Sequence, residues 1–318
     1  MAQGSALAMI GRRLLQAAPV IVLATFIVFG LLKLLPGDVA VTLAGDNATD
    51  DRIAEIRRIY GLDRPFLVQY GVWLWKAAHG DLSQSILSGE QVLTSIARCF
   101  PHTLLIVVMA LGLALLIGVP LGAAAAARPN GLIDRATMTL ASIGIAVPNF
   151  WLAMILVSLF ALRWNIFPAT GATAFSVSPA DAINHAILPA LALAAGGMAE
   201  VARQVRGSLL DVMSSQFVRT LRAKGLKTST ILWRHGLKNI AVNLLTVTGL
   251  LFNRLLAATV VVEAVFAIPG MGGLIVHAAI QRDFTVVQGV VFAMVIVVIL
   301  VNLVTDMLCA AIDPRIGR

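Results

Sequence analysis

Long stretches without charge dominate the pattern of hydrophobic and polar positions along the chain. Five such stretches are long enough to cross a hydrocarbon core, which takes about 20 residues. They span residues 14–32, 99–127, 136–162, 182–199 and 284–305. A sixth apolar stretch, 239–262, is interrupted only by Arg254. The pattern predicts an all-α polytopic membrane protein with six transmembrane helices.

The composition agrees with a membrane protein and argues against nucleic-acid binding. Of the 318 residues, 59% are hydrophobic and 13% are charged, whereas about a quarter of the residues of a soluble domain are charged. The net charge of +8 is not accompanied by interleaved basic and aromatic residues on a soluble surface, so no nucleic-acid partner is expected. We attribute the excess charge to membrane topology.

The distribution of Lys and Arg predicts the orientation in the membrane. With a cytoplasmic N-terminus, six spans place 128–135, 200–238 and the C-terminus on the cytoplasmic side. These segments and the N-terminus hold 14 of the 24 basic residues, eight of them in 200–238, and the two short outer loops hold one each. The positive-inside rule therefore predicts cytoplasmic N- and C-termini. Cys99 and Cys309 then fall on opposite sides, so neither a disulfide nor a metal site is expected.

The predicted spans divide the chain into three parts. The N-terminus and first helix occupy 1–35, an outer loop domain occupies 36–98, and a five-helix core occupies 99–318 with the cytoplasmic loop 200–238. Two segments of the outer domain show helical periodicity and are expected to form short amphipathic helices over the outer mouth. They either pack on the spanning helices or dock an external partner.

Particular residues define these two outer segments. The first is capped by Thr49 or Asp50 and is ended by Gly61. The second starts at Pro65, a residue favoured at the first helical position. The apolar faces comprise Ile53, Ile56 and Ile59 in the first segment, and Phe66, Tyr70, Trp73 and Leu74 in the second.

Prolines and glycines inside the predicted spans indicate bends and close packing. Each proline removes a backbone hydrogen bond that lipid cannot replace, so a kink is expected there. These prolines are Pro19, Pro120, Pro148 and Pro189. Gly118 and Gly122 have the small-xxx-small spacing that favours close approach of a second helix.

Three polar residues inside the predicted spans are candidates for a translocation path: Asn253, Arg254 and Asn302. Charge in a membrane costs a few kcal/mol and therefore usually has a function. Arg254 either meets a substrate carboxylate in a hydrated path or pairs with a carbonyl at a helix interface. Proton- and sodium-coupled carriers usually need a carboxylate or an ion cage near the midplane, and none is evident in the predicted spans.

The stretch RTLRAKGLKTSTILWRHGLKN, residues 219–239, holds six basic residues and no acidic one. Ser214 and Ser215 are expected to cap a short helix that ends at Gly225 in the left-handed conformation. Phe217 and Leu221 would share one face of this helix. The element either anchors on anionic lipid or docks a cytoplasmic protein. KGLKT lacks the glycine and the ending of a P-loop, so an ATP site is not expected.

The RTLRAKG and WRHGLKN segments resemble the cytoplasmic coupling loop of binding-protein-dependent ABC importer permeases. Seven further stretches follow, in order, the first permease subunit of the dipeptide and oligopeptide subfamily. They are LPGDVA, YGLDRPFLVQY, GDLSQS, VPNFWLAMIL, HAILPALALA, VVVEAVFAIPGMGGLIVHAAIQRDFTVVQGVV and DPRIGR. The resemblance covers essentially the whole chain.

This resemblance implies a type I ABC importer permease in the bacterial inner membrane. Its partners would be a second homologous permease, two cytoplasmic ATPases that hold ATP and Mg, an external solute-binding protein and membrane lipid. The chain itself would bind no cofactor and catalyse no covalent step. The residues that the resemblance assigns to ATPase coupling are Phe217, Arg219, Leu221, Ala223, Lys224 and Gly225.

The sequence departs from the subfamily pattern at three positions. Leu221 stands where alanine is usual, Asn243 where proline is common, and Gly273 where arginine is frequent. Di- or oligopeptides are the expected substrates, although relatives also import nickel, metal chelates, glutathione and opines. The alternatives from other classes are a self-sufficient channel or secondary carrier, and a purely structural membrane subunit.

Overall fold

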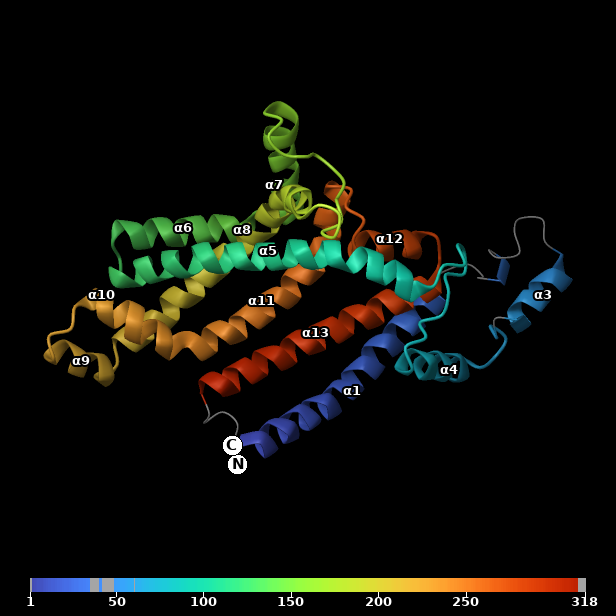
Figure 1. Ribbon diagram of the computed structural model, residues 1–318, viewed down its shortest axis with the longest axis horizontal. Coiled ribbons are helices and arrows are strands. Elements are labelled where there is room, and N and C mark those ends of the chain that lie inside the picture. The colour runs from blue at the N-terminus through green and yellow to red at the C-terminus, as the bar shows by residue number, and fades with distance from the viewer. Residues whose placement is uncertain (1, 35–39, 42–48, 60, 314–318) are drawn as a thin grey trace. The chain divides into compact units, whose positions relative to one another are not determined.

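The computed structural model describes residues 2–34, 40–41, 49–59 and 61–313. The predicted domain boundary at 35/36, Tyr60, and most of the LPGDVA and DPRIGR stretches lie outside the described residues. The described part is mainly helical (Figure 1). Its long helices are α1 (Ala2–Leu34), α5 (Val92–Ala127), α8 (Pro179–Met213), α11 (Leu237–Val265) and α13 (Phe284–Ile312).

Shorter helices connect or flank the long ones. They are α3 (Asp50–Ile59), α4 (Phe66–Ala78), α6 (Leu132–Ala146), α7 (Asn149–Leu156), α9 (Gln216–Ala223), α10 (Thr228–Thr230) and α12 (Met271–Ile280). Two wider π-helical turns, Val157–Arg163 and Ile231–Gly236, continue α7 and precede α11.

Five helical segments of the described chain are long and apolar enough to cross a membrane. They are Leu15–Leu34, Val92–Ala127, Pro179–Met213, Thr228–Val265 and Phe284–Ile312. A sixth span results if Leu132–Ala146 and Asn149–Arg163, which meet at 96°, are counted as one. With that count the predicted all-α polytopic architecture is confirmed.

The bent pair corrects the expectation of one continuous apolar helix over 136–162. The backbone is extended at Val147 and at Pro148, where ψ is 123° and 134°. Proline lacks an amide hydrogen and disfavours the helical conformation in the residue before it, which explains the break at this point. Pro19, Pro120 and Pro189 instead lie inside continuous helices.

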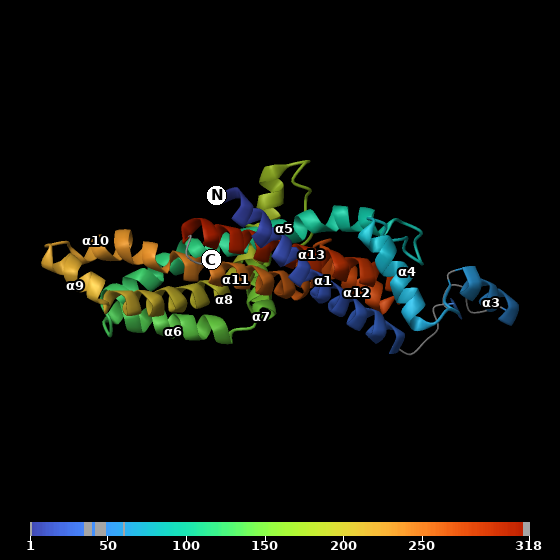
Figure 2. The ribbon, with the colours of Figure 1, turned by 90° about the horizontal axis from the view of Figure 1, so that it is seen from below.

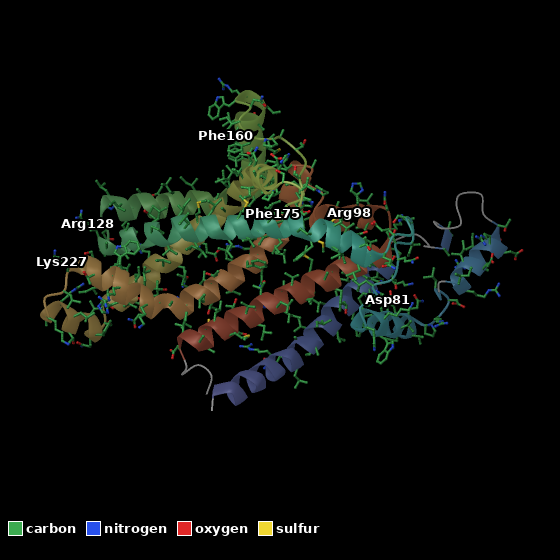
Figure 3. All side chains as sticks on the ribbon, in the orientation of Figure 1. Asp81, Arg98, Arg128, Phe160, Phe175 and Lys227 are labelled. Atoms are coloured by element: carbon green, nitrogen blue, oxygen red, sulfur yellow. The ribbon has the colours of Figure 1, made fainter. Side chains whose placement is uncertain are left out.

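The chain forms two compact units. The first comprises Met1–Ala6, Pro101–Gly272 and Leu300–Arg318, and the second comprises Leu7–Phe100 and Gly273–Ile299. In the first unit α8 packs against α6, α7 and α11 (Figures 1 and 2). Arg128 and Lys227 lie at the same end of this unit (Figure 3). The two internal loops predicted to be cytoplasmic therefore share one end.

Close approach of α5 and α8 defines the core of the first unit. A Cβ atom at Gly122 would lie 2.4 Å from the Ala202 carbonyl oxygen, and one at Gly118 would lie 2.8 Å from the Met198 carbonyl oxygen. Real Cβ atoms essentially never approach other atoms so closely. The helix contact predicted from the Gly118 and Gly122 spacing is therefore confirmed.

In the second unit α4 packs on α1 through the aromatic residues expected from the periodicity. Tyr70 is buried, shares a 2.9 Å hydrogen bond with the Thr25 hydroxyl and donates to the Val22 carbonyl at 2.8 Å. Trp73 contacts Phe292 edge to face with ring centroids 6.0 Å apart. The expected packing of the second outer helix on spanning helices is therefore confirmed, and docking of an external partner stays a prediction.

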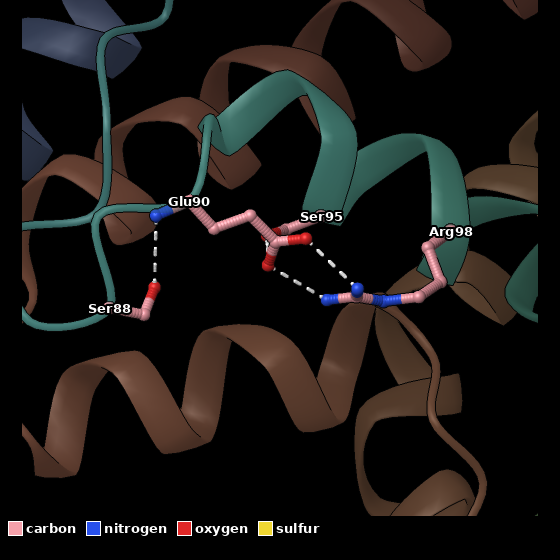
Figure 4. Close-up of polar contacts among 4 residues, drawn as sticks. All are labelled: Ser88, Glu90, Ser95 and Arg98. Carbon is pink, nitrogen blue, oxygen red and sulfur yellow. Dashed lines mark hydrogen bonds and ion pairs between the residues drawn. The ribbon is translucent and has the colours of Figure 1, made fainter.

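The loop that leads into α5 is held by a partly exposed carboxylate, that of Glu90. Arg98 donates two hydrogen bonds of 2.9 Å to the two carboxylate oxygens of Glu90, and the Ser95 hydroxyl donates a third at 2.7 Å (Figure 4). The Glu90 backbone N–H in turn donates to the Ser88 hydroxyl at 3.3 Å. The hydrogen bonds from Arg98 and then from Ser95 hold the pKa of Glu90 below its ordinary value of 4.5.

This arrangement predicts a pH-dependent contribution to stability. Because the folded-state pKa of Glu90 is lowered, its interactions stabilise the fold above pH 4.5 and are lost as the pH falls through the lowered pKa. At pH 7, Glu90→Gln is expected to lower the thermal unfolding midpoint slightly, by roughly 1 °C for such a partly exposed group. The difference from the wild-type chain should shrink in acid. A difference that does not change with pH would contradict the assignment.

Candidate functional site

The helix proposed to couple to a partner begins directly after α8. The Ser214 hydroxyl donates to the Asp211 carbonyl at 2.8 Å, and the Ser215 hydroxyl donates to the Val212 carbonyl at 2.6 Å. Ser215 is the N-cap residue of α9, as predicted, but its side chain forms no capping hydrogen bond, and Ser214 belongs to the end of α8. The last carbonyls of α8 lack partners within their own helix, and the hydroxyls satisfy them instead.

The other end of α9 closes as the sequence predicts. Gly225 has a φ of +80°. Its N–H donates to the Arg222 carbonyl at 2.9 Å, and the Leu226 N–H donates to the Leu221 carbonyl at 3.3 Å. These two hydrogen bonds form a Schellman motif, which requires a left-handed residue at Gly225.

The residues of α9 divide into one buried anchor and an exposed majority. Val218 is fully buried. Phe217 is 44% exposed and lies edge to face with His235 at 6.2 Å between ring centroids, and Leu221 is partly buried. The remaining predicted coupling residues are exposed: Arg219, Ala223, Lys224 and Gly225. Sequence analysis missed Val218 as the anchor, although its spacing to Leu221 is helical.

The helices on either side of α9 are tied together. The Asn243 side-chain amide of α11 donates to the Ser208 hydroxyl of α8 at 2.7 Å. At Gly236, which directly precedes α11, an added Cβ would lie 2.9 Å from the Leu209 side chain of α8, so these two segments approach closely. Asn243, which departs from the subfamily pattern, thus forms a polar contact that proline could not make.

A polar row crosses the spanning helices of the first unit. Arg254 of α11 forms an ion pair with Glu200 of α8, and Asn253 donates to the Asn302 side-chain oxygen of α13 at 2.9 Å. The three predicted path residues therefore lie in one row, with Glu200 as a fourth member. Arg254 pairs with a carboxylate and not with a backbone carbonyl.

Glu200 also corrects the expectation that no carboxylate lies inside a span. It follows directly after the apolar stretch 182–199, which ended the predicted helix, but α8 continues to Met213. Its side chain is 30% exposed and that of Arg254 is 56% exposed. The polar row is thus partly open at the surface of the unit.

A second carboxylate inside a span, that of Glu263 of α11, is buried and accepts hydrogen bonds from neighbouring segments. The Thr103 hydroxyl donates to it at 2.6 Å and the Gly272 N–H donates at 2.8 Å. The Met271 N–H donates to the Thr103 hydroxyl at 2.8 Å. Buried polar groups with these partners stabilise a unique arrangement, here one that joins α5, α11 and the start of α12.

Two family models match the chain. The model described as "Binding-protein-dependent transport system inner membrane component" matches residues 118–318, and its N-terminal companion matches residues 6–107. The inward-facing MetNI methionine ABC transporter has a similar fold, with a TM-score of 0.57 and 20% identity. The similarity covers 70% of this chain and 97% of that one.

Named relatives match over almost their full length. A putative peptide transport system permease of Brucella abortus is 38% identical over 97% of this chain and 98% of the relative. The oligopeptide permease AppB of Bacillus subtilis is 36% identical over 96% of this chain and 98% of AppB. The glutathione permease GsiC of Salmonella choleraesuis is 38% identical over 96% of this chain and 97% of GsiC. The chain therefore belongs to the family of binding-protein-dependent transport system inner membrane components, as a permease of the ABC transporter type.

Proposed function

We propose that this chain is one of two homologous permease subunits of an ATP-driven importer of di- or oligopeptides. It lies in the bacterial inner membrane with both termini in the cytoplasm, and an external binding protein delivers the substrate. The names of the Brucella and Bacillus relatives support a peptide substrate, and glutathione, named for the Salmonella relative, is itself a tripeptide. The Lys and Arg distribution supports the orientation.

The observation that carries this proposal is the exposed helix α9. It is anchored by buried Val218 and closed by Gly225, and it presents Phe217, Arg219 and Lys224 outward. A short helix that exposes aromatic and cationic residues suits docking into a protein cleft. Two ATPase subunits that hold ATP and Mg would receive this helix and its counterpart on the second permease. This chain would contribute no covalent chemistry and no bound cofactor.

The path would run along the polar row. A partly exposed charge pair is costly against lipid, so the face with Arg254 and Glu200 is expected to border a hydrated path or the second permease. Asn253 and Asn302 extend the same row with amide groups. Together these side chains offer charged and neutral hydrogen-bonding groups to a polar substrate.

The connection between α9 and the row supports a route for coupling. Closure of the ATPases would displace α9, which follows α8 directly and leads to α11 through α10 and the π-helical turn Ile231–Gly236. Because Ser208 and Asn243 tie α8 to α11, the two helices would move together. This movement would switch the Arg254 and Glu200 region between outward and inward access.

Purification of the tagged chain from its native membrane tests this proposal. We expect a second permease and ATPase subunits to co-purify, and peptide with the binding protein to stimulate ATP hydrolysis by several-fold. Empty liposomes and a complex without binding protein serve as controls. A chain that purifies alone and conducts or exchanges solute in liposomes would contradict the proposal and favour a channel or carrier.

A further inference from the structure

We propose that Arg254 and Glu200 form a subsite for both charged ends of a zwitterionic peptide, which replaces the ion pair as it passes. The substrate carboxylate would bind Arg254, and its ammonium group would bind Glu200. The inference rests on the proposed peptide-import function. It concerns how the permease itself, and not the binding protein, discriminates among peptides.

The Arg254 and Glu200 pair retains unused hydrogen-bonding capacity. A guanidinium carries five N–H donors, and Arg254 contacts Glu200 through Nη2. Within the described chain the other Arg254 donors have no hydrogen-bond partner, and more than half of the side chain is exposed. A carboxylate that approaches from this face can therefore bind Arg254 in the bidentate geometry that guanidinium favours.

A second ion pair in the same unit shows a different arrangement. Asp134 and Arg206 join α6 to α8, with side-chain exposures of only 3% and 25%. Two Arg206 nitrogens contact the two Asp134 oxygens, and the Asn130 N–H donates to the same carboxylate at 2.8 Å. The Asp134 carboxylate is thus enclosed, and it accepts three hydrogen bonds, as the carboxylate of a structural pair should. The Arg254 and Glu200 side chains are more exposed, at 56% and 30%, and meet through one guanidinium nitrogen and one carboxylate oxygen.

Charge balance explains why a zwitterion would suit the open pair. Removing one partner of a pair in a low-dielectric site leaves an uncompensated charge, which is strongly unfavourable. A ligand with a single charge would separate Arg254 from Glu200 and satisfy only one of them. A ligand with both charges would satisfy both, and the ion pair would form again when it leaves. Blocking one terminus of a peptide should therefore impair its passage.

The experiment uses the complete reconstituted transporter and one tripeptide in three forms: free, N-acetylated and C-amidated. Uptake of each blocked form relative to the free form is compared among wild-type, Glu200→Gln and Arg254→Gln complexes. All complexes use the same binding protein, so its preference among the three forms cancels in the comparison. We expect Glu200→Gln to raise uptake of the acetylated form relative to the free form by at least about tenfold, a change of about 1.4 kcal/mol. Arg254→Gln should do the same for the amidated form.

Asp134→Asn is the matched control, because it alters the enclosed pair and should leave all ratios unchanged. If a single variant fails to assemble, Glu200→Gln combined with Arg254→Gln removes both charges and should favour the doubly blocked tripeptide. Uptake that falls equally for all forms in the variants would overturn the subsite and make the pair structural. A wild-type transporter that moves no form of the peptide would instead overturn the proposed function.

Discussion

Replacing Gly225 with valine is expected to lower peptide-stimulated ATP hydrolysis and uptake by at least about tenfold, while the chain still inserts and assembles. Gly225 has a φ of +80°, a conformation that costs an L-residue roughly 1–2 kcal/mol and a β-branched one more. Among the described residues, no atom beyond the two chain neighbours lies within 4 Å of an added Cβ, so the effect is one of backbone conformation and not of steric clash. Loss of the Schellman motif would reorient the end of α9.

Asparagine at the same position separates conformation from side-chain size. Gly225→Asn should retain most of the activity, because asparagine tolerates the left-handed conformation better than other non-glycine residues. Uptake, ATP hydrolysis and the amount of assembled complex are measured for each variant. Full uptake by Gly225→Val would show that the closed end of α9 is not needed for coupling.

Replacing Gly122 with alanine is expected to cause a large loss of stability, although it adds only a single methyl group. The added Cβ would lie 2.4 Å from the Ala202 carbonyl oxygen and 2.9 Å from the Val205 Cβ. Backbone atoms of α8 cannot rotate away as a side chain can, so α5 and α8 would have to separate. Overpacking of this kind costs about 1–3 kcal/mol or more, which corresponds to a drop in melting temperature of roughly 5 °C.

Gly112 provides a control in the same helix. In the described part of the chain, no atom outside the neighbouring turns of α5 lies within 4 Å of its added Cβ. Alanine is also the better helix former by about 1 kcal/mol. Gly112→Ala should therefore leave the melting temperature in detergent unchanged or slightly raised. Equal melting temperatures for Gly112→Ala and Gly122→Ala would show that α5 does not approach α8 closely at Gly122.

The elements that sequence analysis predicted correctly depend on neighbours along the chain. A run of about 20 apolar residues is long enough to span a membrane whatever surrounds it, so the spans were predictable. The aromatic face of α4 follows from helical periodicity, and Gly225 follows from the chemistry of helix ends. These features involve residues within a few positions of one another.

The predictions from sequence failed in two situations. In one, two segments compete for the same hydrogen-bonding groups, and in the other, a helix extends beyond its apolar stretch. The Ser214 and Ser215 hydroxyls bind the carbonyls of α8, because the end of one helix and the start of the next lie together. Glu200 was placed outside a span because charge ended the apolar stretch. The helix α8 continues through Glu200 to Met213, and Arg254 compensates the charge of the carboxylate.

The sequence by itself therefore determined the helical membrane architecture, the end of α9 and the small-residue surface of α5, since each follows from local chemistry and spacing. Only the tertiary structure decided that Arg254 pairs with Glu200, that Asn253 meets Asn302, and that Val218 anchors α9. Such partners lie on different helices. Which side chains meet depends on how those helices pack, and the cost of leaving a buried polar group unpaired selects the arrangement.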